Sequence, residues 1–380
     1  MTPELITSPD RLAALVGRLG REPMLAFDTE AASFHRYADR VYLIQVSSVR
    51  ETAVIDPLAV QDLSAIGGLL RDPGTEIVFH DADYDLRSLH RDYGFEARRL
   101  FDTRIAAQLL GEPGVGLGTL LKKYFGVTLN KKLQRADWSQ RPLTPEMIAY
   151  AAADTAHLPV LRDALERQLL ERGRLEWARE EFRRLERVRW TSNGADGEAY
   201  LRIKGARALT PRAQAILRAL YGWRESRAQA ADRAPFRVLS NEVLLTLARA
   251  APTDMDSLKS AAGVPASVAQ REGTALVEVV HRALSAPEST WPTRERSERS
   301  PRDLAAELRF ERLKQVRNNR AKDLGIEPGV LCANGLLLEL ARLGPEGLRD
   351  PGAVPDFRGW QREALGEKRI LAALAERAPL

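Results

Sequence analysis

The chain has a single cysteine, Cys332, and no apolar run near the roughly 18 residues needed to cross a bilayer. One cysteine excludes an intramolecular disulfide framework and a zinc site built from cysteines. Residues 1–12 are polar and carry Pro3, Glu4 and Asp10 where a signal peptide would be apolar. We therefore expect no membrane segment, a cytoplasmic location, and chemistry based on carboxylates, histidines or hydroxyls.

The length and composition indicate a folded chain of more than one domain. At 380 residues the chain exceeds the usual size of a single domain, so we expect two or three compact units. Hydrophobic residues make up 44% and charged residues 29%, which supplies apolar material for packed cores and argues against extensive disorder.

Basic side chains are concentrated in the second half of the chain. Residues 1–200 hold 27 basic and 30 acidic side chains, whereas residues 201–380 hold 30 and 22. Within that half, residues 201–250 hold ten and three, and residues 294–322 hold ten and five. Such clusters suit a polyanion such as a nucleic acid, although an arginine-rich protein also carries solvated basic faces without such a partner.

Residues 1–160 alternate between strand-like and helix-like patterns. Short apolar runs rich in β-formers predict strands at 24–28, 41–47, 52–55 and 77–80. Helical patterns fall at 8–19, 60–70, 83–93, 103–110, 117–124 and 144–172. Because the first three strands follow one another closely, we expect an antiparallel meander that joins a mixed sheet through helical crossovers, in an α/β domain.

The basic half contains two related helical segments, 210–285 and 303–374. In each, an arginine lies 14 positions before an asparagine that opens a leucine-rich stretch: Arg227 before Asn241, and Arg320 before Asn334. The equal spacing predicts a repeat of two short helix bundles.

Two carboxylates lie at the end of the first predicted strand. Residues i and i+2 of an extended chain point to the same side, so Asp28 and Glu30 emerge together. Their charges repel unless a cation neutralises them, and hard divalent metals prefer such oxygen ligands. A plain solvated strand end shows the same pattern, so this pair alone does not define a site.

Three aspartates follow the strand at 77–80. Asp81 or Asp83 suits the cap of the next helix, because an aspartate accepts hydrogen bonds from the unpaired N–H groups at a helix start. Asp85 lies further into that helix, directly before apolar residues, where a carboxylate has a less obvious structural reason.

A tyrosine and an aspartate lie four positions apart in the helix expected at 144–172. Tyr150 and Asp154 share one helical face, and the three alanines between them let the helix approach the sheet closely. Alone, such a pair is also typical of a core tyrosine near a surface aspartate.

Taken together, these residues resemble the three exonuclease motifs of the DEDD superfamily in its tyrosine-bearing (DEDDy) branch, and within it the ribonuclease D family. The resembling set is Asp28, Glu30, Asp85, Tyr150 and Asp154, with further matching stretches at 43–45, 55–58, 101–103 and 129–144. The resemblance covers about residues 8–190. It implies a ribonuclease H-like α/β exonuclease fold with a mixed β-sheet.

The resemblance also implies a role for each motif residue. The four acids, Asp28, Glu30, Asp85 and Asp154, would bind two divalent metal ions, Mg²⁺ or Mn²⁺. Such cations lower the pKa of a water and stabilise the leaving 3′ oxygen. Tyr150 would hold the attacking water in line; with an ordinary pKa of about 10 it suits a positioning group better than a base.

Residues around this set are candidates for substrate binding. They are Gln45, His80, Lys131, Gln134, Arg135 and Trp138. Those between 131 and 138 could contact the substrate backbone or brace their loop. His80 is not expected to bind a metal ion, because the four acids suffice as ligands. Ala31 stands where the family commonly has an aromatic residue, which puts the shape of the terminal-base pocket in doubt.

The two basic segments resemble HRDC domains, the small helical bundles that accompany ribonuclease D. The resemblance divides the chain into an exonuclease domain (1–190) and two all-α units, an HRDC domain (205–288) and a second HRDC-like domain (300–380). The second is more divergent, with Phe357–Trp360 in place of the expected small turn. Polar linkers are expected at 191–198 and 286–301. The helical domains would add salt-dependent phosphate contacts that carry little sequence information.

The function that the resemblance implies is a 3′ to 5′ exoribonuclease that releases nucleoside monophosphates by two-metal-ion hydrolysis. The expected substrates are tRNA precursors or other structured RNA with a free 3′ end, and we expect a monomer with no membrane partner. Two alternatives stay open. One is a DNA 3′ to 5′ exonuclease, because no residue can be tied to the ribose 2′-OH. The other is a catalytically silent nucleic-acid-binding protein.

Overall fold

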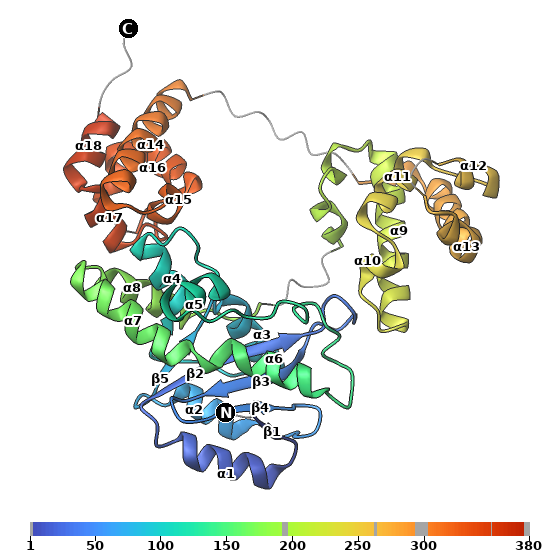
Figure 1. Cartoon of the computed structure of the whole chain (residues 1–380). Helices are drawn as coiled ribbons and strands as arrows, with labels where there is room; N and C mark the ends of the chain where they lie inside the picture. The colour runs from blue at the N-terminus through green and yellow to red at the C-terminus, as the bar shows by residue number, and fades with distance from the viewer. Residues whose placement is uncertain (1–2, 192–196, 262–263, 293–302, 351, 376–380) are drawn as a thin grey trace.

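The computed structural model describes residues 3–191, 197–261, 264–292, 303–350 and 352–375, which form one α/β unit and two helical units (Figure 1). The linkers expected at 191–198 and 286–301 lie partly outside these described residues. Across the described helices, none combines the length and apolarity needed to cross a membrane.

Among the described residues, six strands form a mixed sheet at the centre of the α/β unit. In spatial order they are β1 (Glu4–Ile6), β4 (Thr52–Ile55), β3 (Val41–Ser47), β2 (Met24–Ala31), β5 (Glu76–Phe79) and β6 (Leu100–Asp102). β2, β3 and β4 pair antiparallel, whereas β1, β5 and β6 join in parallel pairs, so the predicted meander and mixed sheet are confirmed. The patterns did not predict β1 and β6, since three-residue strands show no clear period.

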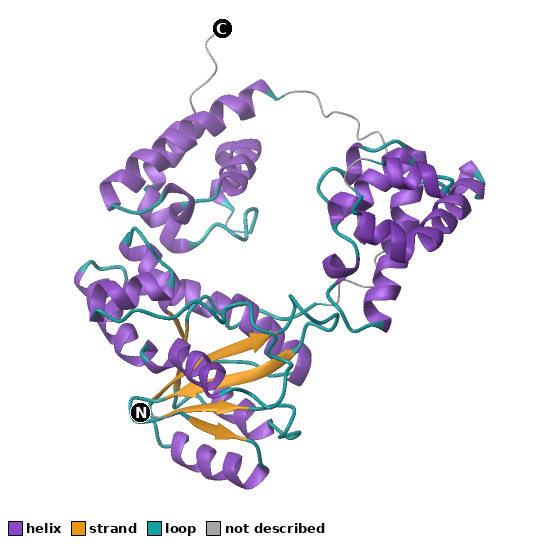
Figure 2. Ribbon diagram, turned by 45° about the vertical axis from the view of Figure 1, so that its right-hand side comes forward, coloured by secondary structure: helices purple, strands orange, loops and turns teal. Residues whose placement is uncertain are grey.

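Helices pack around this sheet (Figures 1 and 2). They are α1 (Pro9–Leu19), α2 (Ser64–Arg71), α3 (Asp83–Tyr93), α4 (Thr103–Leu110), α5 (Leu117–Phe125), α6 (Pro145–Ala156), α7 (Leu158–Glu171) and α8 (Leu175–Leu185). α6 lies against β2, β3 and β4, and α7 lies against β2 and β5. The single helix expected at 144–172 is therefore wrong: it is divided at His157, with Pro159 in the first turn of α7.

Local sequence explains why α6 lies so close to the sheet. Thr144 caps the helix by accepting a hydrogen bond from the Met147 N–H, and Pro145 occupies the first turn, where a missing N–H costs nothing. Ala151 and Ala152 are buried against the residues of β3 and β4. Their small side chains leave the helix room to approach, so that its residues reach the sheet surface.

The first helical unit runs from 199 to 290. It contains η1 (Ala199–Arg202), η2 (Ala206–Ala208), α9 (Pro211–Ala230), α10 (Pro235–Val238), α11 (Asn241–Ala250), α12 (Met255–Ser260), α13 (Ala266–Ser285) and η3 (Glu288–Thr290). Its buried apolar residues, from Tyr200 to Ala283, form a core of their own.

The second helical unit runs from 304 to 375 among the described residues. It contains α14 (Leu304–Leu324), α15 (Pro328–Leu331), α16 (Asn334–Arg349), α17 (Gly359–Leu365) and α18 (Glu367–Ala375). Its core is continuous with that of the α/β unit. At the junction Trp360 stacks on Trp177 with ring centroids 5.4 Å apart, and the Glu180 carboxylate accepts from the N–H groups of Gly359 (2.8 Å) and Trp360 (2.9 Å).

A shared arginine contact marks the two helical units as repeats. Buried Arg224 donates to the Asn241 side chain (2.7 Å), and buried Arg317 donates to the Asn334 side chain (2.6 Å), each across 17 positions. Each arginine also donates to the backbone carbonyl two residues before its asparagine, at 3.3 and 2.9 Å. The equal contacts support the repeat that the spacing predicts.

Candidate active site

β2 places two acids on the sheet face that α6 covers. In the β2–β3 ladder Asp28 pairs with Gln45 and Glu30 pairs with Leu43, and Leu43 packs with residues of α6. The register shifts immediately after Glu30, so regular pairing ends beside the two carboxylates. The expected i, i+2 relation thus places both acids at the end of regular pairing.

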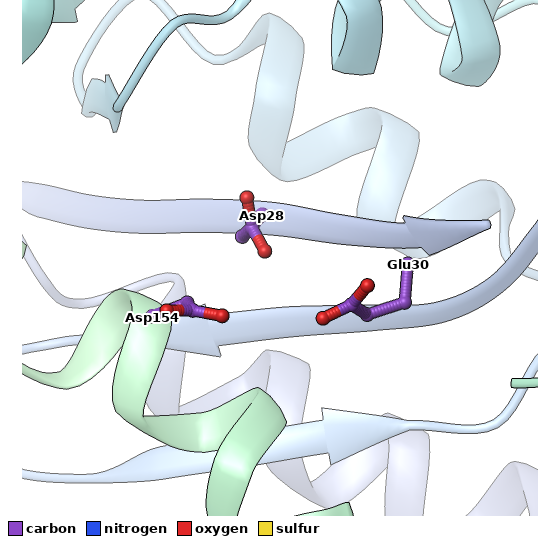
Figure 3. Close-up of side chains that lie close together, drawn as sticks. All are labelled: Asp28, Glu30 and Asp154. Atoms are coloured by element: carbon purple, nitrogen blue, oxygen red, sulfur yellow. The ribbon is translucent and has the colours of Figure 1, made fainter. Parts of the chain in front are cut away.

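Asp154 of α6 completes a cluster of three carboxylates. One oxygen from each of Asp28, Glu30 and Asp154 lies within 4.8 Å of the others. Figure 3 shows the three side chains converging on one space beside β2 and α6. Oxygen ligands gathered at this spacing suit a hard divalent cation.

Asp85 lies beside the cluster and is hydrogen-bonded to Thr29, the residue between Asp28 and Glu30. Its Oδ1 accepts hydrogen bonds from the Thr29 N–H (3.1 Å) and from the Thr29 hydroxyl (2.6 Å). The Asp85 side chain is buried in the first turn of α3. The fold therefore brings the four predicted acids to one place, three in the cluster and the fourth held by Thr29.

The predicted cap of α3 is wrong. The N-cap position is Ala82, whose N–H donates to the Asp102 carboxylate (2.8 Å). Asp81 instead pairs with Arg104 (2.9 Å), and Asp83 pairs with an arginine one turn along α3 (2.7 Å). No side chain of a described residue caps the start of α3, whereas Asp102 caps α4 by accepting from the N–H groups of Arg104 and Ile105.

Burial is the largest of the causes that raise the pKa of each of the four acids. For Asp28, burial is the largest cause and the charges of Asp85, Asp154 and Glu30 follow; burial also dominates for Glu30. Burial raises the pKa of Asp85 to about 7, against the hydrogen bonds from Thr29, and that of Asp154 to about 6. Negative charge collected here at neutral pH is unfavourable until cations neutralise it. The donor set fits divalent metal binding.

The acids open into a cavity of about 440 Å³. Of the predicted substrate-binding residues, His80, Lys131 and Gln134 line this cavity together with Tyr150. A neighbouring cavity of about 250 Å³ is also lined by Tyr150 and Asp154, so the tyrosine lies where the two spaces meet.

Several lining residues were missed by the sequence analysis. They are Thr29, Tyr84, Arg104, Gly116, Leu117, Gly118, Thr119, Leu129 and Asn130. The family resemblance could have indicated two of these, since Leu129 and Asn130 belong to the matching stretch at 129–144. Arg104 directly follows the matching stretch at 101–103. The 116–119 segment at the start of α5 carried no such indication.

Tyr150 keeps its proton at neutral pH. Burial raises the pKa of its phenol, and the charges of Asp154, Glu30 and Asp28 raise it further. A protonated phenol can donate a hydrogen bond but cannot act as a base. The geometry therefore favours a positioning role.

Trp138 braces the tyrosine helix. Its indole is 1% exposed and packs against the Tyr150 ring with centroids 5.8 Å apart. Arg141 holds the same loop, because it donates to the Trp138 carbonyl (2.8 Å) and makes two hydrogen bonds with Asp56 (2.6 and 2.7 Å). Of the two roles left open for Trp138, its burial supports bracing.

Gln45 and Arg135 also lie away from the main cavity. The Gln45 side chain is fully buried, with no hydrogen-bond partner among the described residues, so its burial contradicts the expected substrate contact. The Gln45 side chain is buried because α6 covers the face of β3 on which it lies. Arg135 is exposed, with its guanidinium 5.2 Å from the centre of the Phe34 ring.

His80 is uncharged at neutral pH. Burial, followed by the charge of Arg104, lowers the pKa of its imidazole to about 4. Its Nδ1 lies 2.9 Å from the Thr103 hydroxyl, which orients the ring at the cavity wall. A neutral imidazole offers the cavity a polar group without charge.

Family comparisons identify both parts of the chain. A 3′-5′ exonuclease model matches residues 3–170, and an HRDC domain model matches residues 213–280 and again 306–374. Fold and sequence together define a 3′ to 5′ exonuclease that carries two HRDC domains.

Comparison with individual relatives shows which family of 3′ to 5′ exonucleases the chain belongs to. Ribonuclease D of Gluconacetobacter diazotrophicus is 32% identical over 371 residues, covering 97% of this chain and 92% of the relative. Ribonuclease D of Escherichia coli is 33% identical over 293 residues, covering 77% and 78%. The chain therefore belongs to the ribonuclease D family and is a metal-dependent 3′ to 5′ exoribonuclease.

The solved structures agree with this assignment. The crystal structure of E. coli RNase D, described as an exoribonuclease involved in structured RNA processing, matches with a TM-score of 0.73 and 28% identity, covering 98% of this chain and 99% of that one. The catalytic core of RRP6 from Trypanosoma brucei matches with a TM-score of 0.65 and 28% identity, covering 74% and 82%. The match to E. coli RNase D includes the helical units.

Adding Mg²⁺ or Mn²⁺ is expected to raise the Tm of the metal-free protein, and to raise it more at pH 8 than at pH 5. A carboxyl whose pKa is higher in the folded than in the unfolded chain costs stability wherever it is ionised. With the pKa of Asp154 at about 6 and that of Asp85 at about 7, metal-free stability falls as pH rises from about 4 through about 7. Calorimetry at both pH values checks this; an equal shift at both would contradict it.

Proposed function

We propose that this chain removes nucleoside monophosphates one at a time from the 3′ ends of RNA. The substrate class is tRNA precursors and other structured RNA with a free 3′ end, and one chain suffices because every acid comes from the same polypeptide. The observation that carries the proposal is the gathering of Asp28, Glu30 and Asp154 within 4.8 Å at the wall of a cavity.

The four acids would hold two divalent cations, Mg²⁺ or Mn²⁺. Asp28, Glu30 and Asp154 supply the clustered oxygens, and Asp85, oriented by its hydrogen bonds from Thr29, supplies a fourth carboxylate. When bound, such cations activate a water and stabilise the charge that develops on the phosphate and on the leaving 3′ oxygen. Because Thr29 fixes Asp85 against β2, the ligand geometry is set before substrate arrives.

The remaining cavity residues would hold the 3′-terminal nucleotide. Lys131 and Arg104 bring positive charge to the lining, which suits the scissile phosphate, while neutral His80 and Gln134 offer hydrogen bonds. We propose domain limits of 1–190, 205–288 and 300–380, of which 1–2, 262–263, 300–302, 351 and 376–380 lie outside the described residues. The two helical domains, which carry the excess basic charge, would hold the rest of the strand.

Tyr150→Phe is expected to lower kcat by about ten- to a hundredfold with little change in KM, because it removes one hydrogen-bond donor that orients the nucleophile. The ring still packs on Trp138, so the fold should be unchanged. Steady-state kinetics on a 3′-tailed RNA measure both constants. A rise in KM with unchanged kcat would show that the hydroxyl binds substrate instead.

The proposed function is tested with 5′-labelled single-stranded RNA and DNA of equal sequence, in Mg²⁺, Mn²⁺ or EDTA. Stepwise shortening of RNA from its 3′ end, with release of mononucleotides and no reaction in EDTA, is the expected result. Degradation of DNA alone would support the DNA exonuclease. Binding without cleavage of either polymer would support the silent binding protein.

A further inference from the structure

A cavity of opposite charge lies in the first helical unit. It has a volume of about 210 Å³ and lies where the end of α9, α10 and the start of α13 meet. Four arginines line it: Arg227, Arg233, Arg237 and Arg271. We call this cavity the arginine pocket. The carboxylate in its described lining, Glu272, pairs with Arg227 at 3.1 Å.

The other three guanidinium groups make no ion pair with a described residue. Arg237 donates to a backbone carbonyl, and Arg271 donates to the Ser267 carbonyl in its own helix. Elsewhere the chain's arginines commonly face carboxylates, as Arg162 does with Glu76 (2.5 Å). With four arginines and one glutamate in its described lining, the arginine pocket holds an excess of positive charge in a small space, which favours an anionic ligand.

The start of α13 adds to this charge. Val268, in the first turn of this 20-residue helix, lines the arginine pocket, and its N–H donates to the Pro265 carbonyl (2.9 Å). No side chain of a described residue caps the helix start. The unpaired N–H groups of a first turn carry partial positive charge, as the helix dipole requires. Arginine guanidinium groups and a helix N-terminus are both groups that bind phosphate in proteins.

Contacts with the catalytic unit hold the arginine pocket beside the loop that follows Glu30. The Ala234 N–H donates to the His35 carbonyl (3.2 Å), and the Tyr37 N–H donates to the Asp232 carboxylate (3.2 Å). The rings of Phe34 and Phe236 meet edge to face with centroids 6.2 Å apart, which closes the same junction.

A line of cations connects the two sites through this junction. Lys131 lines the active-site cavity, and Arg135, four residues on, lies over the Phe34 ring. The Phe34 carbonyl accepts from Nε of Arg237 (2.5 Å), and Arg237 also lines the arginine pocket. A strand that leaves the active site along these residues therefore meets positive charge at each step.

We propose that the arginine pocket binds a backbone phosphate of the RNA strand whose 3′ end occupies the active site, upstream of the scissile bond. The inference rests on the proposed function. Arg233 and Arg271 clamp the phosphate, while Arg237 both contacts it and joins the pocket to the loop at Phe34. The contact carries no base information; it adds affinity for strands long enough to span both sites.

The test compares Arg233→Glu/Arg271→Glu with Arg212→Glu/Arg282→Glu. Both double variants change the net charge equally, and the control residues are exposed on the same helical unit outside the arginine pocket. Binding of a long 3′-tailed RNA is measured at several salt concentrations. We expect the pocket variant to bind about tenfold more weakly, with a log–log salt slope smaller by about 0.7, as the loss of one neutralised phosphate on a single strand predicts.

Two further measurements locate the ligand. A single neutral methylphosphonate linkage, moved along the RNA, should weaken binding to the wild type at one upstream position and have no effect there on the pocket variant. Hydrolysis of a dinucleotide, too short to reach the arginine pocket, should be equal in both proteins.

Defined outcomes would overturn the inference. They are wild-type binding by the pocket variant, an equal loss in the control variant, or competition by inorganic phosphate with no sensitive methylphosphonate position. The last result would make the arginine pocket a site for free phosphate. If wild-type protein binds RNA but cleaves nothing, the proposed function fails while the binding test of the arginine pocket still stands.

Discussion

Asp28→Asn and Asp154→Asn will each lower the rate of RNA hydrolysis by about a thousandfold or more. Each change removes one charged oxygen from the cluster of carboxylates that lies within 4.8 Å, while keeping the size of the side chain. Metal ions contribute several kcal/mol of transition-state stabilisation, and each 1.4 kcal/mol corresponds to a factor of ten in rate. Single-turnover rates with excess metal on a 3′-tailed RNA measure the loss.

These variants should still fold and bind RNA. Because burial raises the pKa of both carboxyls, and the neighbouring acids raise that of Asp28 further, removing one charge relieves an unfavourable interaction in the metal-free protein. Asp83→Asn is the matched control: Asp83 is an exposed acid of the same region that pairs with Arg87 outside the described lining of the cavity. We expect the control to keep its rate within about twofold, since exposed ion pairs contribute little. A rate above one-tenth of wild type in either cluster variant would contradict the site.

Local periods explain why the sequence predicts most of the site. Asp28 and Glu30 follow from the two-residue period of a strand, and Tyr150 and Asp154 follow from the four-residue spacing of a helix face. Each relation needs only a few neighbouring residues. The hydrogen bonds that fix Asp85 on Thr29 span 56 positions, so no local pattern contains them.

Local sequence patterns did not predict which polar and aromatic side chains near the site are buried. Gln45 was expected to contact substrate as part of a stretch that matches the family, but α6 covers its face of the sheet and leaves the amide fully buried. Trp138 is buried for a related reason, since its loop folds under the tyrosine helix. Which polar residues reach a cavity depends on what packs over them, and that information lies elsewhere in the chain.

In the second helical unit, too, a contact with a distant part of the chain could not be predicted from local sequence. Its Phe357–Trp360 segment departs from the turn expected of a second HRDC copy, and the sequence offers no reason. In the structure this segment starts α17 against α8 of the catalytic unit, where Trp360 meets Trp177 and its indole N–H donates to the Glu181 carboxylate (2.6 Å). The departure from the repeat is the contact that joins the two cores.

Trp360→Ala is therefore expected to lower the free energy of unfolding of the catalytic unit by about 3–5 kcal/mol, although the residue belongs to the second helical unit. Removing a 3% exposed tryptophan leaves a cavity in a core that both units share. Two parts with one continuous core should unfold together, whereas the first helical unit, with its separate core, should unfold independently.

Hydrogen exchange at the amides of β2 and β3 measures this coupling, because those strands lie in the catalytic core. Trp360→Ala should speed their exchange about a hundredfold or more under conditions where exchange requires global unfolding. Leu244→Ala is the matched control, since Leu244 is fully buried in the core of the first helical unit and its loss should speed exchange there alone. Unchanged protection of β2 and β3 in the tryptophan variant would show that the second helical unit docks without stabilising the catalytic fold.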